Sequence, residues 1–196
     1  MSFETTCAFT GHRPEKLPFP SCDQNCDAYV RFRGQLTREI CRMAREEGVK
    51  TFLSGGARGV DTWAMEAVSR LKYYDPSIRL IAVLPFRGHN PFREPTERQR
   101  YELLLARCDR IVYVSEQYHP ACFHARNRWM VDHAAHLLAV YDGVQKGGTA
   151  YTQWNMPQSA AGTSSPSPRK YSIRGDDVYF PIYSPGVLPV TRRNIR

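Results

Sequence analysis

A glycine-rich turn constrains this chain more than any other stretch, and it reads Ser54-Gly55-Gly56-Ala57-Arg58-Gly59-Val60-Asp61. The β-prone run Val49 to Leu53 precedes it, and apolar residues at helical spacing follow it from Val60 to Leu71. The turn is therefore predicted to join a strand to a helix. Glycine lets a ligand approach the backbone closely, and the N-terminus of a helix attracts anions such as phosphate.

Two interpretations of this turn remain. We favour a phosphate- or nucleotide-binding loop, because Arg58 and Asp61 accompany three glycines within one turn. The alternative is a tight turn that only connects the strand to the helix. The spacing matches neither the G-x-G-x-x-G pattern nor a Walker loop, so neither of those labels applies.

The apolar pattern predicts five strands that alternate with helices. Strands are expected at 6–10, 49–53, 79–86, 111–115 and 137–141, and helices at about 32–47, 60–71, 96–108 and 123–135. This alternation is typical of the α/β class, with a doubly wound, mainly parallel sheet. Right-handed crossovers place all loops that follow strands at one edge of such a sheet, where ligands bind.

Residues in these loops form the predicted ligand site. They are Gly11, His12, Arg13, Ser54, Gly55, Gly56, Arg58, Gly59, Asp61, Asp142, Gly147, Gly148 and Thr149. Arg13 and Arg58 suit bidentate phosphate binding, and the alternative for both is a surface charge. Asp61 either caps its helix or binds a ribose hydroxyl, and Asp142 is similar. His12 is a candidate acid or base, although a hydrogen-bonding role in the loop is more common.

Composition suits one α/β domain with an appendage, since the chain has 196 residues of which 42% are hydrophobic. We place the domain at 1–152, and a Ser/Pro-rich linker with a basic C-terminal extension at 153–196. From Gln153 onward, six Lys/Arg against two Asp give +4, half of the net charge of +8. The sequence has neither a signal peptide nor an apolar stretch of about 20 residues, so a cytoplasmic protein without membrane contact is expected.

Six cysteines include a C-x3-C pair, Cys22 and Cys26, without a comparable second pair. A zinc site needs more ligands, and only His119, Cys122 and His124 are clustered. We therefore expect no metal and free thiols.

Three segments in order resemble the YpsA-like family of the SLOG superfamily. They are Thr10-Gly11-His12-Arg13-Pro14-Glu15-Lys16-Leu17, the glycine-rich turn continued to Ala64, and Arg126-Asn127-Arg128-Trp129-Met130-Val131-Asp132 with the Gly147-Gly148-Thr149 region. The resemblance covers about residues 5–152, and the core of the second segment is shared with DprA. It implies a Rossmann-like sheet that binds nucleotides or their derivatives. The chain beyond this domain is expected to form an irregular C-terminal extension, and no cofactor is expected to be required.

The related LOG proteins are phosphoribohydrolases, and this chain departs from their pattern. Arg126 stands where they carry an arginine, but Thr152 occupies the position of their glutamate. A hydroxyl cannot replace a carboxylate in stabilising an oxocarbenium cation or activating water. If the chain is nevertheless an enzyme, Arg126 and Asp142 are the catalytic candidates.

The expected function is binding or sensing of a nucleotide derivative, either ADP-ribose-like or a nucleoside phosphate, in a bacterial or phage protein. The first alternative is a hydrolase or transferase acting on an N-glycosidic bond. The second is DprA-like binding of single-stranded DNA, which ranks lower because the aromatic residues lie mostly at core spacing. Trp63 and Trp129 are accordingly interpreted as packing residues, and a homodimer is left open.

Overall fold

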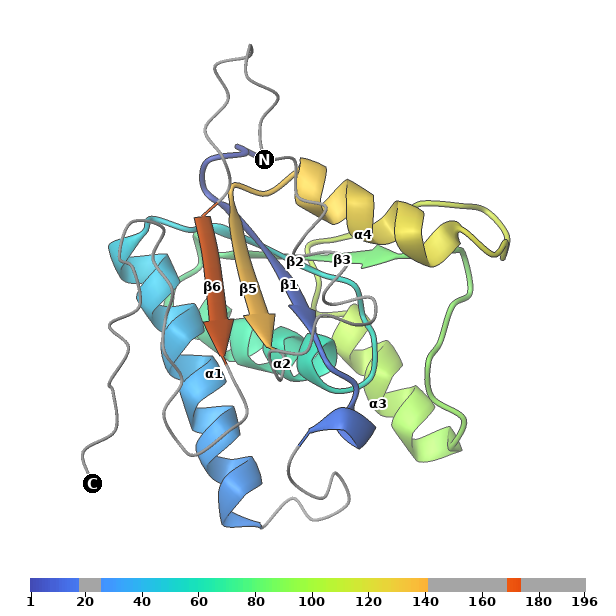
Figure 1. The fold of residues 1–196 in the computed structure, drawn as a ribbon, viewed down its shortest axis with the longest axis horizontal. Coiled ribbons are helices and arrows are strands. Elements are labelled where there is room, and N and C mark those ends of the chain that lie inside the picture. The colour runs from blue at the N-terminus through green and yellow to red at the C-terminus, as the bar shows by residue number, and fades with distance from the viewer. Residues whose placement is uncertain (18–25, 141–168, 174–196) are drawn as a thin grey trace, which may run out of the picture.

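The described residues form a sheet of six strands in which every neighbouring pair is parallel (Figure 1). A computed structural model describes residues 1–17, 26–140 and 169–173. The strands are β1 (Thr6–Gly11), β2 (Thr51–Ser54), β3 (Arg79–Leu84), β4 (Arg110–Tyr113), β5 (His136–Val140) and β6 (Arg169–Ile173). The helices are α1 (Asp27–Glu46), α2 (Val60–Tyr74), α3 (Pro95–Leu105) and α4 (Cys122–Asp132), with a 3-10 turn, η1, at Pro14–Lys16.

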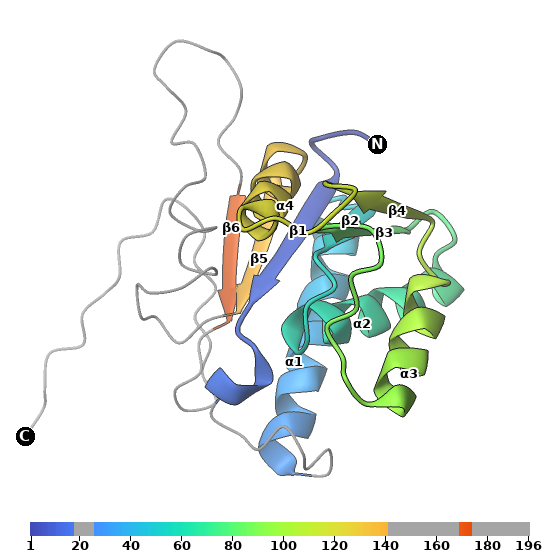
Figure 2. The ribbon, with the colours of Figure 1, turned by 90° about the vertical axis from the view of Figure 1, so that its right-hand side faces the viewer.

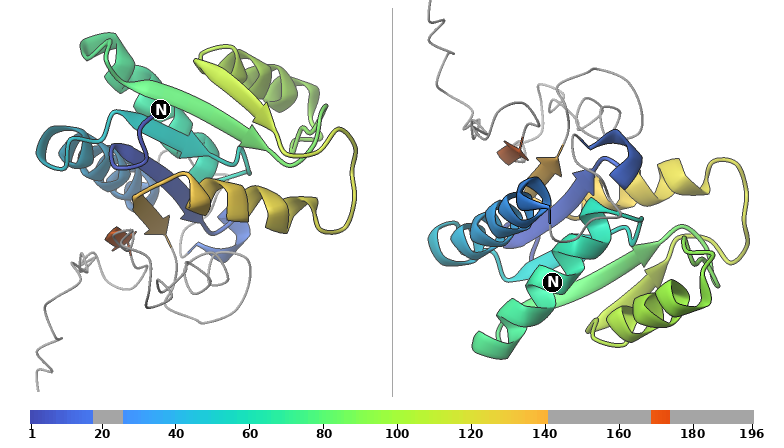
Figure 3. Two further views of the ribbon diagram at one scale, coloured as in Figure 1. Left: turned by 90° about the horizontal axis from the view of Figure 1, so that it is seen from above. Right: turned by 90° about the horizontal axis from the view of Figure 1, so that it is seen from below.

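Helices cover both faces of the sheet, because successive side chains of a strand point to opposite sides. In β1, Cys7 and Phe9 pack with α1 and α2, whereas Ala8 faces α4. Figure 3 shows α4 in front of the sheet from above and α2 in front of it from below.

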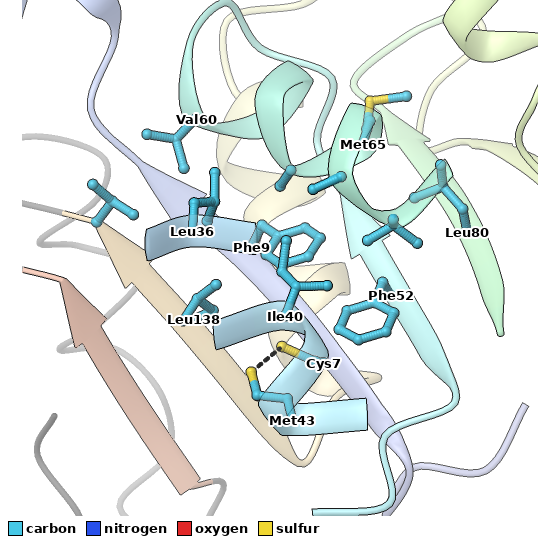
Figure 4. Packing of buried hydrophobic residues seen from close by; sticks show 14 of the residues in the cluster. Cys7, Phe9, Leu36, Ile40, Met43, Phe52, Val60, Met65, Leu80 and Leu138 are labelled. Atoms are coloured by element: carbon cyan, nitrogen blue, oxygen red, sulfur yellow. Dashed lines mark hydrogen bonds between the residues drawn. The ribbon is translucent and has the colours of Figure 1, made fainter. Parts of the chain in front are cut away.

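The larger core lies between the sheet and the layer formed by α1, α2 and α3 (Figure 2). Leu36, Ile40 and Met43 occur at helical spacing along α1 and are fully buried against this face of the sheet (Figure 4). Phe9 and Phe52 stack on neighbouring strands, with ring centroids 5.6 Å apart. This packing gives β1 and β2 a rigid base, and both strands deliver their following loops to the same edge.

Strand order decides where those loops meet. The order is β4-β3-β2-β1-β5-β6, so the chain moves outward from β1 to β4 and then crosses to the other side of β1. The order reverses between β1 and β5, and ligands of doubly wound sheets bind beside such a switch point. The His12 amide donates to the carbonyl of Val140 at 3.0 Å, which extends the pairing to this edge.

The Rossmann-like α/β fold and all five predicted strands are confirmed, with boundaries shifted by at most a few residues. The first long helix begins at Asp27, ahead of its first predicted apolar marker, Phe32. Strand β6 was not predicted, because Arg169-Lys170-Tyr171-Ser172-Ile173 lacks an apolar run, and its pairing with β5 is a tertiary feature. The Gly147–Thr149 region lies outside the described residues.

Within the described ranges, no helix has both the length and the apolar character needed to cross a membrane.

Candidate functional site

The glycine-rich turn between β2 and α2 is held together by its own side chains. The buried Ser54 hydroxyl donates to the carbonyl of Asp61 at 3.1 Å and accepts the Gly56 amide at 3.3 Å. Gly56 has a φ of 65°, and a side chain there would meet the hydroxyl of Tyr101. Ser54 therefore shapes the turn from inside, rather than presenting its hydroxyl to a ligand.

A buried arginine from the opposite face of the sheet closes over this turn. Arg126 of α4 donates from Nη1 to the carbonyl of Gly55 at 2.6 Å, and the same atom lies 3.7 Å from Oδ2 of Asp61. Arg126 and Asp61 are only 9% and 6% exposed. A Cβ on Gly55 would collide with the guanidinium, so glycine is required there by the close approach of Arg126.

The charge of Arg126 is incompletely compensated. Burial lowers the pKa of its guanidinium, and Asp61 offsets this only in part. Burial also raises the pKa of Asp61, against the opposing effects of Arg126, the Ala57 amide and Arg13. Among the described residues, Nε of Arg126 has no hydrogen-bond partner. One buried ion pair with few supporting hydrogen bonds stabilises weakly, and a further anion nearby would favour the arginine.

A cavity of about 370 Å³ lies beside this pair, at the carboxyl end of β1. It is lined by Phe9, Thr10, Gly11, His12, Arg13, Lys16, Ala57, Asp61, Phe123, His124, Arg126, Asn127 and Met130. Among the described residues of the lining, the three cations Arg13, Lys16 and Arg126 face one carboxylate, Asp61, so their formal charges sum to +2 when histidines are counted as neutral. We name this space the anion cavity. Its charge suits a phosphate, and its place matches the switch point of the sheet.

A second hollow, of about 300 Å³, lies between α2, α3 and η1, and Arg58 lines it. Arg58 pairs with Glu15 at 3.1 Å and is absent from the lining of the anion cavity. Gly59 and Pro14 also line this hollow and pack against each other, since a Cβ on Gly59 would lie 2.8 Å from Cδ of Pro14. Arg13 and Arg58, which the sequence suggested as equivalent phosphate contacts, therefore belong to different hollows.

The tryptophans are packing residues, as expected. Trp63 makes edge contacts with Tyr29 and Phe32, with centroids 5.4 and 5.8 Å apart, although it also borders the second hollow. Trp129 stacks on His133 at 3.8 Å. Arg126 and Arg128 point to different sides of α4, because Arg128 is exposed and pairs with Asp132 at 3.6 Å.

Four of the predicted site residues belong to a part of the chain that the structure does not describe. Asp142, Gly147, Gly148 and Thr149 lie outside the described residues. Gly11 is placed at the cavity, where its backbone packs against Val60. In the described part of the chain, no cluster of three metal-binding side chains occurs.

Sequence reasoning missed Lys16, Phe123 and His89 as site residues. Lys16 and Phe123 line the anion cavity, and the ring of His89 contacts Phe123 with centroids 5.6 Å apart. His89 lies in the loop that follows β3, and nothing in the sequence of that loop indicates which of its side chains contacts α4. The contact between His89 and Phe123 depends on the position of α4, which comes from a distant part of the chain.

His89 is expected to remain neutral at pH 7. Burial and the positive charges of Arg126 and Arg13 lower its pKa to about 4, from an ordinary value of 6.5. The unfolded chain takes up this proton first, so His89 makes folding less stable as the pH falls from 6.5 toward 4. Imidazole C–H signals followed by NMR should titrate near 4, and Arg13→Ala should raise the midpoint. A midpoint near 6.5 in the folded protein would contradict this placement of His89.

Comparison with known proteins adds a family and a few distant relatives. The protein-family model YpsA, described as the YspA SLOG family, matches residues 7–167. The UPF0398 protein BH1768 of Halalkalibacterium halodurans is 29% identical over 146 residues, covering 72% of this chain and 75% of that protein. The UPF0398 protein YpsA of Bacillus subtilis (strain 168) is 28% identical over 147 residues, covering 74% and 79%.

Among solved structures, that of DNA processing protein A (DprA) from Streptococcus pneumoniae superimposes with a TM-score of 0.41 and 18% identity. The superposition covers 68% of this chain and 40% of that one.

Proposed function

Because the chain belongs to the YspA SLOG family, we propose that its anion cavity binds the phosphate of a nucleotide or nucleotide derivative. The observation that carries the proposal is the buried Arg126, whose charge is incompletely compensated beside a cavity of positive lining. Arg13 and Lys16 supply further cations at the rim, and α2 begins at Val60 next to the same space. Guanidinium groups and helix N-termini are common partners of phosphate.

The ligand class follows from this chemistry. An ADP-ribose-like molecule or a nucleoside phosphate carries a phosphate, which the cations favour. It also carries ribose hydroxyls, which can donate hydrogen bonds to the carboxylate of Asp61. The size of the cavity lies at the lower end of the range for small-molecule sites. The protein accordingly serves as a binding module or sensor for such a molecule, and it uses its own side chains without a further cofactor.

The test is a ligand screen by thermal unfolding, followed by calorimetry. AMP, NAD, ADP-ribose, cyclic nucleotides and single-stranded DNA are the probes. A ligand at 100 times its dissociation constant should stabilise the protein by about 2.7 kcal/mol. Stabilisation by at least one nucleotide, beyond that given by the same concentration of inorganic phosphate, supports the proposal. Absence of stabilisation by every nucleotide contradicts it.

Arg13→Ala is expected to weaken nucleotide binding by about 1.5 to 3 kcal/mol, the range for a charge-assisted hydrogen bond. Arg13 is exposed at the rim of the cavity, so the free energy of unfolding should change by less than about 0.5 kcal/mol. Arg58→Ala is the matched variant, because Arg58 lines the second hollow. Calorimetry showing the larger loss in Arg58→Ala would move the phosphate to the second hollow.

An N-glycosidic hydrolase is the second candidate, and Asp61 is the observation in its favour. Its carboxylate lines the anion cavity and has a raised pKa, as acids and bases in catalysis often do. The hydrolase ranks second because Asp61 already accepts a hydrogen bond from the Ala57 amide at 3.2 Å and pairs with Arg126. Chromatography of the same nucleotide incubations decides the matter. Multiple turnovers of free base that disappear in Asp61→Asn would put the hydrolase first.

DprA-like binding of single-stranded DNA ranks third. Such binding requires a basic groove that follows several phosphates, and its affinity falls steeply with salt. The same calorimetry at two salt concentrations separates this function from binding of a mononucleotide.

A further inference from the structure

Four aromatic rings gather beyond the carboxyl ends of β3 and β4, and we call them the aromatic cluster. Phe86 and His89 follow β3, Tyr118 follows β4, and Phe123 lies in the first turn of α4. Phe86 is at the centre, with its ring centroid 5.0 Å from that of His89, 5.7 Å from Tyr118 and 6.4 Å from Phe123. The loop after β3 and the stretch from Tyr118 to Phe123, which are distant from each other in sequence, thus contribute to one aromatic surface.

The aromatic cluster and the anion cavity share a wall. Phe123 belongs to both, since it lines the cavity and contacts the rings of His89 and Phe86. The charges of Arg126 and Arg13 act on His89, which places this ring within the field of the cavity. Phe86, His89 and Phe123 are partly exposed, and Tyr118 is 65% exposed. Rings that served only to fill a core would be covered.

We propose that the aromatic cluster binds the heteroaromatic base of the ligand whose phosphate lies in the anion cavity, with Phe123 as the stacking partner. This inference rests on the proposed function, and it specifies that the ligand is a nucleotide with its base attached, rather than a sugar phosphate. Aromatic side chains stack on any base, because every base has a π-face. The rings of Phe86 and His89 lie at 89° and 81° to that of Phe123, so neither of them is stacked parallel on it, and Phe123 also lines the anion cavity.

The second hollow is the rival position for a base. Tyr29, Trp63, Phe92 and Tyr101 line it, and Phe92 contacts Tyr101 with centroids 5.5 Å apart. Among the described residues, none lines both this hollow and the anion cavity. A base held there would have its phosphate near Arg58 and Arg100, both of which are already paired with glutamates. We therefore favour the aromatic cluster, where the adjoining cations include the incompletely compensated Arg126.

The experiment compares AMP with ribose 5-phosphate, which lacks the base, by calorimetry at pH 7. Phe123→Leu keeps an apolar side chain but removes the ring, so it should weaken AMP binding by about 5- to 100-fold, the range for one stacked base. Ribose 5-phosphate should bind Phe123→Leu and the wild type equally. Phe123→Tyr keeps the ring face and should retain AMP affinity. Phe92→Leu is the matched control from the second hollow, and it should leave both affinities unchanged.

Each other outcome overturns the inference. Equal losses for both ligands in Phe123→Leu would show a general effect on the cavity, and an AMP-specific loss in Phe92→Leu would place the base in the second hollow. If the wild type binds AMP and ribose 5-phosphate with the same affinity, and Phe123→Leu changes neither, the phosphate site stands without base recognition. If the wild type binds neither ligand nor any other nucleotide, the proposed function fails, and this inference fails with it.

Discussion

Gly55→Ala is expected to lower the free energy of unfolding by about 3 kcal/mol, at the upper end of the range for overpacking a core. The new Cβ would collide with the guanidinium of Arg126 and approach Oδ2 of Asp61 to 2.9 Å. These are parts of a buried ion pair, so moving either one also weakens the other. Urea unfolding followed by circular dichroism measures the change.

Gly34→Ala is the matched control, because Gly34 lies inside α1, where an added Cβ finds only the flexible Arg38 guanidinium at 3.8 Å. Alanine has the higher helix propensity, so this substitution should stabilise the protein by up to about 1 kcal/mol. Equal stabilities of the two alanine variants would show that Arg126 does not lie against Gly55. Loss of nucleotide binding in Gly55→Ala at temperatures where it stays folded would follow from displacement of Arg126.

Arg126→Met should lower the free energy of unfolding by about 3 to 5 kcal/mol, because it leaves Asp61 buried without its cation. It also removes the donor to the Gly55 carbonyl. Nucleotide binding should be lost in the variant. Arg128→Met on the same helix is the control, since its exposed pair with Asp132 is worth less than about 1 kcal/mol. Chemical unfolding of both variants gives the comparison.

The stability of Arg126→Met should depend on pH in a definite direction. Burial already raises the pKa of Asp61, and Arg126 is the strongest influence that lowers it. Without Arg126, the folded protein holds this proton more tightly than the unfolded chain. The loss of unfolding free energy caused by Arg126→Met should therefore be greatest above the raised pKa of Asp61 in the folded protein. It should shrink as the pH falls toward 3.8, the ordinary pKa of this carboxyl.

The double variant Arg126→Met/Asp61→Asn separates the ion pair from general packing. Asparagine keeps an oxygen that accepts the Ala57 amide, while the buried negative charge is removed. The loss in the double variant should be smaller than the sum of the single losses by at least about 1 kcal/mol. Strict additivity would show that the two side chains do not interact in solution.

The sequence alone was sufficient for the order of elements and for the edge of the sheet at which the loops after the strands meet. Apolar periodicity placed β1 to β5 and α1 to α4, because positions that face the core recur at strand or helix spacing in these elements. The positions of Gly55 and Gly56 also followed from the sequence, since few other residue types suit a strand-to-helix turn. The sequence did not predict strand β6, because this strand depends on pairing with β5 and has no apolar pattern of its own.

Only the tertiary structure decided which charges meet. Arg58 lies three residues from Asp61 in sequence, yet Arg126, 65 residues farther along, is the arginine that contacts this carboxylate. The reason is geometric, since the crossover after β4 sets α4 on the opposite face and carries Arg126 over the ends of the strands. The aromatic cluster arises in the same way, from loops and a helix that the strand order brings to one edge. Spacing along the chain determines local structure, whereas the order of strands determines which side chains share a cavity.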